Sequence, residues 1–207
     1  MTVLDQILQH KIVAIIRGAG SADVLDISKA LYDGGVRLVE VTLNSPNAIR
    51  SIEILSAALE DKMLIGAGTV LDASAAKTAV GAGARFIISP TLDPDTIRQT
   101  KDLGAVSMPG AFTPTEIYQA YIAGGDIIKV FPGILGVEYI KSIRAPLPQI
   151  PMMPTGGVSA ENIRSFLDAG AVAFGIGTAL VNPQKALTEA YLAEISANAR
   201  KFVESIS

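Results

Sequence analysis

The stretch VRLVEVTLNSPNAIRSIEILSAALEDKMLIGAGTV, from Val36 to Val70, contains the structural unit that decides the fold. Apolar runs over 36–43 and 63–70 are typical of strands buried on both faces, and an amphipathic stretch over about 46–60 separates them. The Ser45-Pro46 pair predicts the start of that helix, because proline is favoured at the first helical position. A strand, a helix and a second strand in this order are typical of α/β proteins.

The same alternation continues along all 207 residues. We expect strands at 12–16, 36–43, 63–70, 85–90, 105–110, 126–132, 150–155 and 171–177. We expect helices at about 22–33, 46–60, 72–81, 94–103, 114–123, 136–145, 160–169 and 184–204. Eight such units predict a single (β/α)8 TIM barrel that spans residues 1–207 as one domain. The alternative is an open doubly wound sheet, which is disfavoured because no G-x-G-x-x-G follows the first strand.

The composition excludes several classes of function. The net charge of −3 argues against an electrostatic grip on nucleic acid, and no apolar run approaches the roughly 18 residues of a membrane helix. The chain has no cysteine, and residues 1–5 lack the basic start of a signal peptide, so we expect a cytoplasmic protein. His10 is the only histidine, and we interpret it as a surface residue. We therefore expect no metal site and no cofactor.

Lys129 is the most informative residue, because it lies within the apolar run Ile127-Ile128-Lys129-Val130-Phe131. Lysine is almost never fully buried unless it is paired, and burial lowers the pKa of its amine. A neutral amine near pH 7 is a nucleophile that forms Schiff bases with carbonyl compounds. The sequence therefore indicates that Lys129 is a catalytic nucleophile.

Glu40 is the only acidic residue in the middle of an apolar strand, Leu38-Val39-Glu40-Val41-Thr42-Leu43. Period-2 alternation places Leu38, Glu40 and Thr42 on one face, which we expect to point into the barrel. A carboxyl group there has a tunable pKa and suits general acid–base catalysis. The alternative is a purely structural ion pair with Lys129 or Arg17.

Further polar residues stand where the predicted strands end, and active sites of barrel enzymes lie at that end of the strands. Arg17 follows the first strand and suits a carboxylate or a phosphate, unless it forms only a salt bridge at the rim. The glycines of Gly66-Ala67-Gly68-Thr69 allow a ligand to approach the backbone. The other residues of this kind are Asn44, Lys129, Thr155, Gly177 and Thr178.

Two glycine-containing segments, Thr155-Gly156-Gly157-Val158-Ser159 and Gly175-Ile176-Gly177-Thr178, follow the seventh and eighth predicted strands. Loops in these positions form a recurrent phosphate site in barrels, built largely from backbone N–H groups. We favour phosphate binding over the alternative of two ordinary tight turns, because both loops carry paired or nearly paired glycines.

Six ordered motifs together resemble the family of 2-keto-3-deoxy-6-phosphogluconate aldolases, which includes 4-hydroxy-2-oxoglutarate and phosphogalactonate aldolases. The motifs are Val13-Ala14-Ile15-Ile16-Arg17, Glu40-Val41-Thr42-Leu43, Gly66-Ala67-Gly68-Thr69-Val70, Ile88-Ser89-Pro90, Lys129-Val130-Phe131-Pro132 and Pro154-Thr155-Gly156-Gly157-Val158. The resemblance covers nearly the whole chain and implies a metal-independent class I aldolase that is typically a homotrimer.

The resemblance also implies a role for each residue. Lys129 would form the Schiff base with C2 of the 2-keto acid, and Glu40 would be the general acid–base residue. The groups that bind the keto acid and its carboxylate would be Arg17, Gly68, Thr69, Thr155, Pro90 and Asn44. The groups that bind the phosphate would be Gly156, Gly157, Gly177 and Thr178.

The implied reaction gives pyruvate and glyceraldehyde 3-phosphate from the phosphorylated sugar acid, or pyruvate and glyoxylate from 4-hydroxy-2-oxoglutarate. Leu43-Asn44-Ser45-Pro46 is similar to the phosphogalactonate branch, whereas Pro154-Thr155-Gly156-Gly157 is similar to the phosphogluconate branch, so both C4 epimers stay open. Two alternatives to an aldolase also stay open. One is a phosphosugar isomerase or epimerase without an imine, and the other is a non-catalytic phosphate-binding barrel.

Overall fold

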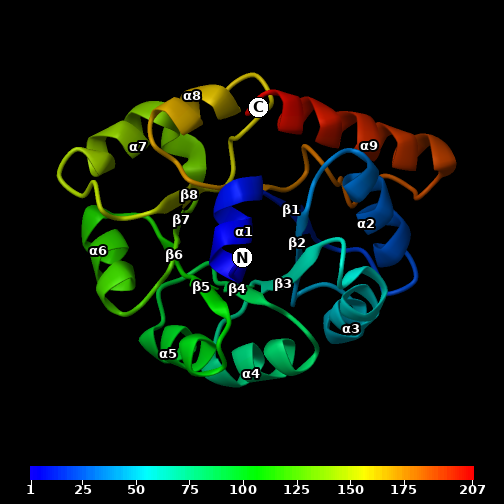
Figure 1. Ribbon diagram of the computed structural model, residues 1–207, viewed down its shortest axis with the longest axis horizontal. Coiled ribbons are helices and arrows are strands. Elements are labelled where there is room, and N and C mark those ends of the chain that lie inside the picture. The colour runs from blue at the N-terminus through cyan, green and yellow to red at the C-terminus, as the bar shows by residue number, and fades with distance from the viewer.

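The computed structural model describes all of residues 1–207 as alternating strands and helices (Figure 1). The strands are β1 (Ile12–Ile16), β2 (Leu38–Thr42), β3 (Leu64–Gly68), β4 (Phe86–Ile88), β5 (Val106–Met108), β6 (Gly110–Ala111), β7 (Ile128–Val130), β8 (Met152–Pro154) and β9 (Phe174–Ile176). The helices are α1 (Val3–His10), α2 (Val24–Asp33), α3 (Ala48–Leu59), α4 (Ala73–Gly81), α5 (Pro94–Asp102), α6 (Pro114–Ile122), α7 (Gly136–Arg144), α8 (Ile163–Asp168) and α9 (Glu189–Glu204), with a 3-10 helix η1 (Gly133–Leu135).

The expected closed barrel of eight strands is wrong, although the α/β class is right. Six parallel strands form one sheet in the order β5-β4-β3-β2-β1-β9, and three form a second sheet in the order β6-β7-β8. The run expected as one strand over 105–110 is split at Pro109, which has no N–H to donate to a ladder. On the other side, a single bridge between Thr155 and Gly175 connects β8 to β9, where β8 ends at Pro154. The hydrogen-bonded ladders are therefore interrupted at two places, between β5 and β6 and between β8 and β9.

Helix α1 was missed by the sequence analysis. Thr2 and Asp5 form a capping box, in which the Thr2 side chain accepts from Asp5 N–H and the Asp5 side chain accepts from Thr2 N–H. Ile7 of this helix is fully buried. Figure 1 shows α1 lying across the centre of the ring of strands, at the end from which the strands start. The T-x-x-D signal ahead of an apolar run would have identified this helix.

The predicted helix starts agree with the structure to within two residues, except that α8 and α9 begin three and five residues after the predicted starts at 160 and 184. Thr113 forms a capping box with Glu116, and Asp93 accepts a hydrogen bond from Thr96 N–H, each ahead of a proline in the first turn. The start predicted from Ser45-Pro46 is two residues early, because α3 begins at Ala48 after Asn47, whose φ is 52°. The Ser45 hydroxyl makes other contacts instead, which are described below.

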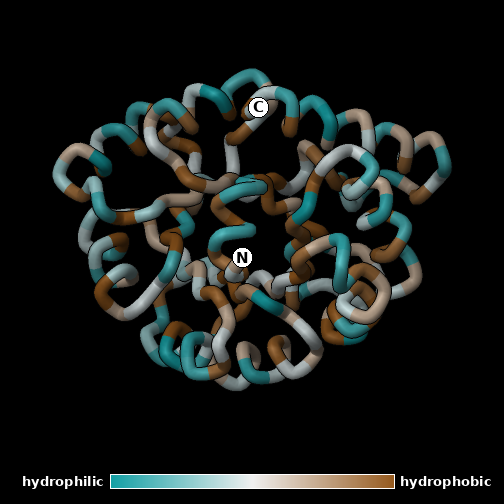
Figure 2. The backbone as a smooth tube through the Cα atoms, in the orientation of Figure 1, coloured by the Kyte–Doolittle hydropathy of each residue, from teal (hydrophilic) through white to brown (hydrophobic).

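The hydrophobic core has two parts, separated by the strands. The larger cluster of 44 buried residues lies between the strands and the surrounding helices. The smaller cluster of ten lies inside the ring and consists of Ile7, Val13, Leu38, Phe86, Ile88, Val106, Met108, Ile127, Met153 and Ala173. Figure 2 shows hydrophobic segments along the strands and hydrophilic residues on the outer turns of the helices. The inner cluster fills the end of the ring that α1 covers and leaves the opposite end for polar residues.

None of the helices combines the length and the apolar character that a membrane crossing would require.

Candidate active site

Lys129 lies on β7 with only 3% of its surface exposed, as expected from its apolar neighbours. It is in register with Met153 of β8 and is two residues from Ile127, and both of these belong to the inner cluster. The side chain therefore points into the ring. Its Nζ lies 5.0 Å from the centre of the Phe131 ring. Burial lowers the pKa of Lys129, the charge of Glu40 opposes this, and the charge of Arg17 adds to it.

Glu40 lies on β2 and is fully buried. It is in register with Ile15 and Gly66 and is two residues from Leu38, which belongs to the inner cluster, so it too points into the ring. Neither carboxyl oxygen has a hydrogen-bond partner in the protein. Burial raises the pKa of Glu40, and the charges of Lys129 and Arg17 oppose that rise. A carboxyl group with a raised pKa is thus kept free of hydrogen bonds to the protein.

The alternative role of Glu40 as half of a buried ion pair has no direct contact to support it. All seven ion pairs in the structure, defined by a nitrogen–oxygen distance of at most 4.0 Å, involve other residues. Six of the seven join side chains of which both are more than one third exposed. Glu40 and Lys129 share one interior and influence each other's pKa, without forming a contact pair.

The end of β3 is shaped around the Glu40 carboxyl. A Cβ atom at Gly68 would lie 1.6 Å from Glu40 Oε1, so only glycine leaves room for that oxygen. The next residue, Thr69, has a φ of 56°, which is rare for a residue with a branched Cβ. Strained backbone of this kind is concentrated at functional sites. Gly68 and Thr69 therefore form one wall of the site beside Glu40.

A cavity of about 230 Å³ opens at the strand ends, and neighbours of both Lys129 and Glu40 line it, although these two residues do not. Ile15, the register partner of Glu40, and Phe131, whose ring faces Lys129, both line it. Of the predicted binding residues, it contains Arg17, Thr155, Gly156, Gly157, Gly177 and Thr178. The cavity thus brings together the two predicted phosphate loops from separate parts of the chain, and Phe131 connects it to the Lys129 amine.

Thr155 lies between the glycine loop that follows β8 and the interior of the ring of strands. Its Oγ1 is buried without a hydrogen-bond partner, and a Cβ atom at Gly175 would lie only 2.3 Å from it. A buried hydroxyl without a partner is costly unless a ligand or water completes it. Thr155 is therefore suited to a contact with a polar group of a substrate held in the cavity.

Four predicted binding residues do not line this cavity, and one of them is Gly68, which lies against Glu40. Thr69 is half-buried after β3, and Pro90 is half-buried after β4 with its carbonyl against Gly110. Asn44 is exposed after β2. A larger open hollow of about 780 Å³ lies beside the starts of α3 and α4 and contains neither Lys129 nor Glu40. No group of three or more acidic, histidine or cysteine side chains is arranged to hold a metal ion.

The family model for KDPG and KHG aldolase matches residues 3–197 of the chain. The chain belongs to this aldolase family. A 2-dehydro-3-deoxy-6-phosphogalactonate aldolase of Escherichia coli (strain K12) is 37% identical over 171 residues, which cover 82% of this aldolase and 83% of that protein. The predicted family, its aldolase activity and the class of carbon–carbon lyase are confirmed.

Two solved structures extend the comparison. A KDPG aldolase from Legionella pneumophila, with pyruvate captured as a covalent carbinolamine, is 28% identical with a TM-score of 0.87, covering 96% of this aldolase and 97% of that chain. A designed cube-shaped cage, made by fusing symmetric oligomeric domains, contains a chain 33% identical with a TM-score of 0.88, covering 94% of this aldolase and 71% of that chain.

Two hydroxyl groups that were not predicted from the sequence connect two loops of the aldolase by hydrogen bonds. Thr42 Oγ1 and Ser45 Oγ are 3.0 Å apart, and Ser45 Oγ accepts a hydrogen bond from Gly18 N–H at 2.9 Å. Gly18 follows Arg17, and Thr42 is two residues beyond Glu40 on the same face. The position of Thr42 on the Glu40 face was readable from the sequence, but the contact of Ser45 with Gly18, which lies 27 residues away, was not.

Proposed function

We propose that this aldolase cleaves 2-keto-3-deoxy-6-phosphogluconate, or its C4 epimer, to pyruvate and glyceraldehyde 3-phosphate through an imine on Lys129. It would cleave 4-hydroxy-2-oxoglutarate to pyruvate and glyoxylate by the same steps. The observation that carries the proposal is the burial of Lys129 and Glu40 on one interior face, beside a glycine-lined cavity.

The lowered pKa of Lys129 supports its role as the nucleophile. The neutral amine attacks C2 of the keto acid, and loss of water leaves a protonated imine. When the C3–C4 bond breaks, its electron pair moves into the imine and forms an enamine, so no metal is required for this step.

The free carboxyl oxygens of Glu40 support its role as the acid–base group. Glu40 accepts the proton of the C4 hydroxyl as the C3–C4 bond breaks and the aldehyde leaves. The same carboxyl then returns a proton to C3 of the enamine. Hydrolysis of the resulting imine releases pyruvate and restores the Lys129 amine.

The cavity residues support recognition of an anionic substrate. Backbone groups of Gly156, Gly157 and Gly177, with the Thr178 hydroxyl, would hold the phosphate, and Thr155 would contact the keto acid. Arg17 adds the positive charge that a carboxylate or phosphate needs. The carboxylate would lie against Gly68 and Thr69, and Pro90 and Asn44 would complete the walls.

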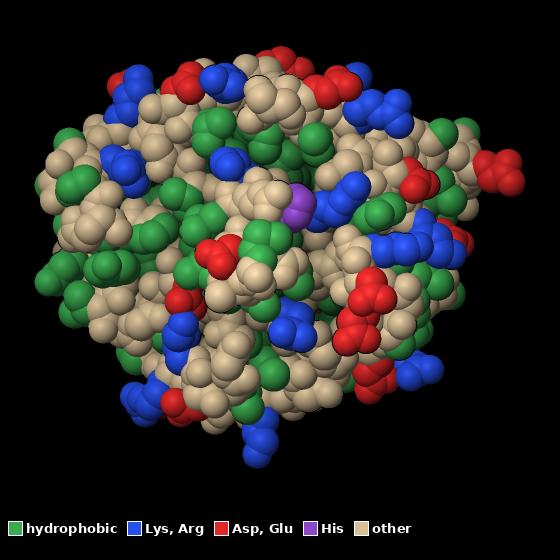
Figure 3. Space-filling view, viewed as in Figure 1, with side chains coloured by type: hydrophobic (Ala, Val, Ile, Leu, Met, Phe, Trp, Pro, Cys, Tyr) green, Lys and Arg blue, Asp and Glu red, His purple; other side chains and the backbone are tan.

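The same proposal places the protein in the cytoplasm as a homotrimer, and an exposed apolar surface supports self-association. Tyr118 and Ile122 of α6 are 46% and 62% exposed, and Ile134 and Leu135 of η1 are 73% and 52% exposed. Hydrophobic side chains gather on the α6 side of the molecule in Figure 3. Large exposed apolar patches commonly mark protein interfaces. Sedimentation of the purified protein at the mass of three chains would support this assembly, and a monomer would contradict it.

Borohydride trapping with pyruvate tests the proposed chemistry directly. Reduction of the imine leaves a stable adduct, which peptide mass analysis should locate on Lys129. An isomerase or epimerase that uses Lys129 only as a charge, or a non-catalytic phosphate-binding protein, gives no adduct. Cleavage assays with both C4 epimers, run side by side, then identify the preferred sugar acid.

A further inference from the structure

The connection from β9 to α9 carries Gly177 and Thr178 at the wall of the cavity. The N–H groups of Leu180 and Val181 both donate to the Gly177 carbonyl, at 2.9 and 3.0 Å, which closes one tight turn. Leu180 and Val181 are 1% and 3% exposed and anchor the turn in the outer core. The position of Gly177 and Thr178 is therefore set by whatever holds the chain directly after Val181.

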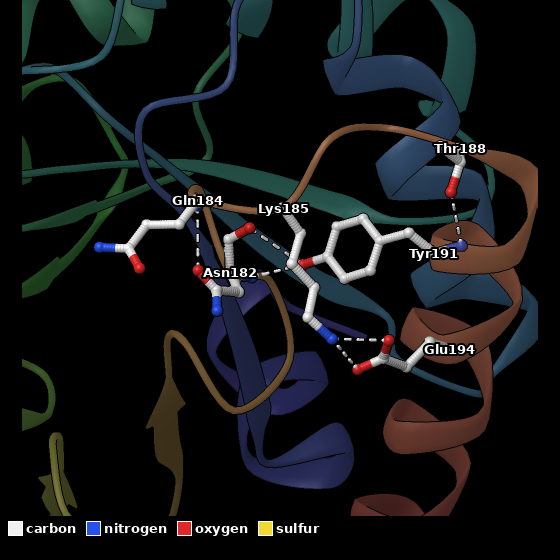
Figure 4. Close-up of polar contacts among 6 residues, drawn as sticks. All are labelled: Asn182, Gln184, Lys185, Thr188, Tyr191 and Glu194. Atoms are coloured by element: carbon white, nitrogen blue, oxygen red, sulfur yellow. Dashed lines mark hydrogen bonds and ion pairs between the residues drawn. The ribbon is translucent and has the colours of Figure 1, made fainter.

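The chain after Val181 is held by the hydroxyl of Tyr191, on the first turn of α9 (Figure 4). This hydroxyl accepts a hydrogen bond from Asn182 N–H at 2.5 Å and donates one to Asn182 C=O at 3.1 Å. Tyr191 is 7% exposed, so solvent does not readily replace either bond. A phenolic hydroxyl both donates and accepts, and it can therefore satisfy both backbone groups of one residue.

Helix α9 provides a firm base for this contact. A Cβ atom at Gly34 of the α2 C-terminus would lie 2.4 Å from Ala199 Cβ of α9, so the two helices meet without room for adjustment. A second tether, the Lys185–Glu194 ion pair, also appears in Figure 4. Both of its side chains are about half exposed, at 45% and 46%, so its contribution is small. Tyr191 is thus the main link between α9 and the loop.

The same loop packs against Gly18, the residue that follows Arg17. A Cβ atom at Gly18, whose φ is 79°, would lie 3.2 Å from Pro183 Cβ, and Pro183 and Arg17 line the cavity together. Gly18 is in turn held by the Ser45 hydroxyl. Movement at Asn182 would therefore displace both the Gly177–Thr178 turn and the contact beside Arg17.

We propose that Tyr191 is a positioning residue for recognition of the substrate's phosphate group, acting through Asn182 on the Gly177–Thr178 turn. This inference rests on the proposed function. Tyr191 touches neither Lys129 nor Glu40, which are carried by β7 and β2. Loss of the hydroxyl should weaken phosphate binding and leave imine formation unchanged, a division that general destabilisation would not produce.

The test is Tyr191→Phe in the full chain, with Tyr32→Phe as the matched control. Tyr32 lies on α2, and no hydrogen bond of its hydroxyl is found. In Tyr191→Phe we expect the KM for the phosphorylated sugar acid to rise about tenfold, with kcat within about twofold, as the loss of one or two buried hydrogen bonds implies. Inhibition by inorganic phosphate should weaken by a similar factor, and the rate of borohydride trapping with pyruvate should not change.

Unchanged KM and phosphate inhibition in Tyr191→Phe would overturn the positioning role, and so would an equal loss in cleavage and in pyruvate trapping. Failure of the proposed function looks different. A wild-type protein that gives no trapped adduct lacks the imine chemistry. A wild-type protein that forms the adduct but is not inhibited by inorganic phosphate lacks the phosphate site.

Discussion

The two ends of the interior are built from the same strand faces, yet one end is a packed apolar floor and the other is a charged site. The floor residues Val13, Leu38, Ile127, Met153 and Ala173 all belong to the inner cluster. Two positions further along each chain segment, the same faces carry Ile15, Glu40, Lys129, Thr155 and Gly175. Both groups are buried, so burial by itself does not separate structure from function.

The difference lies in whether the buried groups satisfy one another. The floor consists of apolar side chains that α1 covers, and its burial stabilises the fold. The site buries two ionisable groups and a hydroxyl, with no partner in the protein for the Glu40 and Thr155 oxygens. Desolvation of such groups opposes folding, and the rest of the core offsets that cost. Changes in the floor should affect stability, and changes in the site should affect activity.

Lys129→Met should have the largest effect. The amine that we propose as the nucleophile is removed, so we expect no detectable cleavage and no trapped pyruvate. The melting temperature should not fall, because an apolar side chain of similar length replaces a buried cation. Lys77→Met, at an exposed position on α4, is the control and should keep full activity. Residual cleavage in Lys129→Met would exclude the imine mechanism.

Glu40→Gln should lower kcat by about 10²- to 10⁴-fold, the usual contribution of a general acid–base group. The variant should still form the trapped pyruvate adduct, since Lys129 is intact. Stopped-flow cleavage assays and borohydride trapping separate the two steps. Glu53→Gln, on the exposed face of α3, is the control. Near-normal cleavage by Glu40→Gln would show that another group moves the proton.

Gly68→Ala should lower kcat about 10²-fold, because the new methyl group would displace the carboxyl proposed as the acid–base group by about an ångström or more. The Cβ would otherwise lie 1.6 Å from Glu40 Oε1. Gly81→Ala is a matched control, since a Cβ there meets no atom within 4 Å. Steady-state kinetics of both variants provide the comparison, and equal activity would mean that Glu40 need not keep its observed position.

Ile7→Ala should destabilise the fold by about 2–5 kcal/mol, as expected for a fully buried aliphatic side chain of the inner cluster. Activity per folded molecule should not change at temperatures below unfolding. Urea denaturation and kinetics at low temperature measure the two effects. Gln9→Ala, exposed on the same helix, should change stability little. A loss of kcat in Ile7→Ala without unfolding would show that the apolar floor affects activity as well as stability.

The pH dependence of pyruvate trapping should show the smallest effect. The lowered pKa of Lys129 means that the neutral amine is reached below its ordinary value of 10.5, so the trapping rate should level off below that pH. Because the folded amine binds fewer protons than the unfolded one in this window, stability should rise with pH there. Glu40→Gln should move the midpoint to lower pH, since the Glu40 charge raises the pKa of Lys129. An unmoved midpoint would show that the two groups are not coupled.

The alternation of strands and helices, and the residues that break its pattern, could be read from the amino-acid sequence without the structure. Lys129 and Glu40 were identifiable because the burial of an ionisable side chain within an apolar strand is costly. Such a residue is therefore rare in a buried strand unless it has a function. The glycine pairs after the last strands were readable for a similar local reason, since they mark backbone that a ligand can approach.

The tertiary structure alone decided how the strands close and which loops meet. The run expected as one strand over 105–110 is split at Pro109, and a single bridge joins β8 to β9, so two sheets replace the expected continuous barrel. Residues that are distant in the chain are in contact in the folded protein. Gly68 packs against Glu40, and the Tyr191 hydroxyl binds the backbone of Asn182. Local patterns report the cost of placing one residue in one environment, whereas these contacts depend on how separate elements are oriented when the whole chain packs.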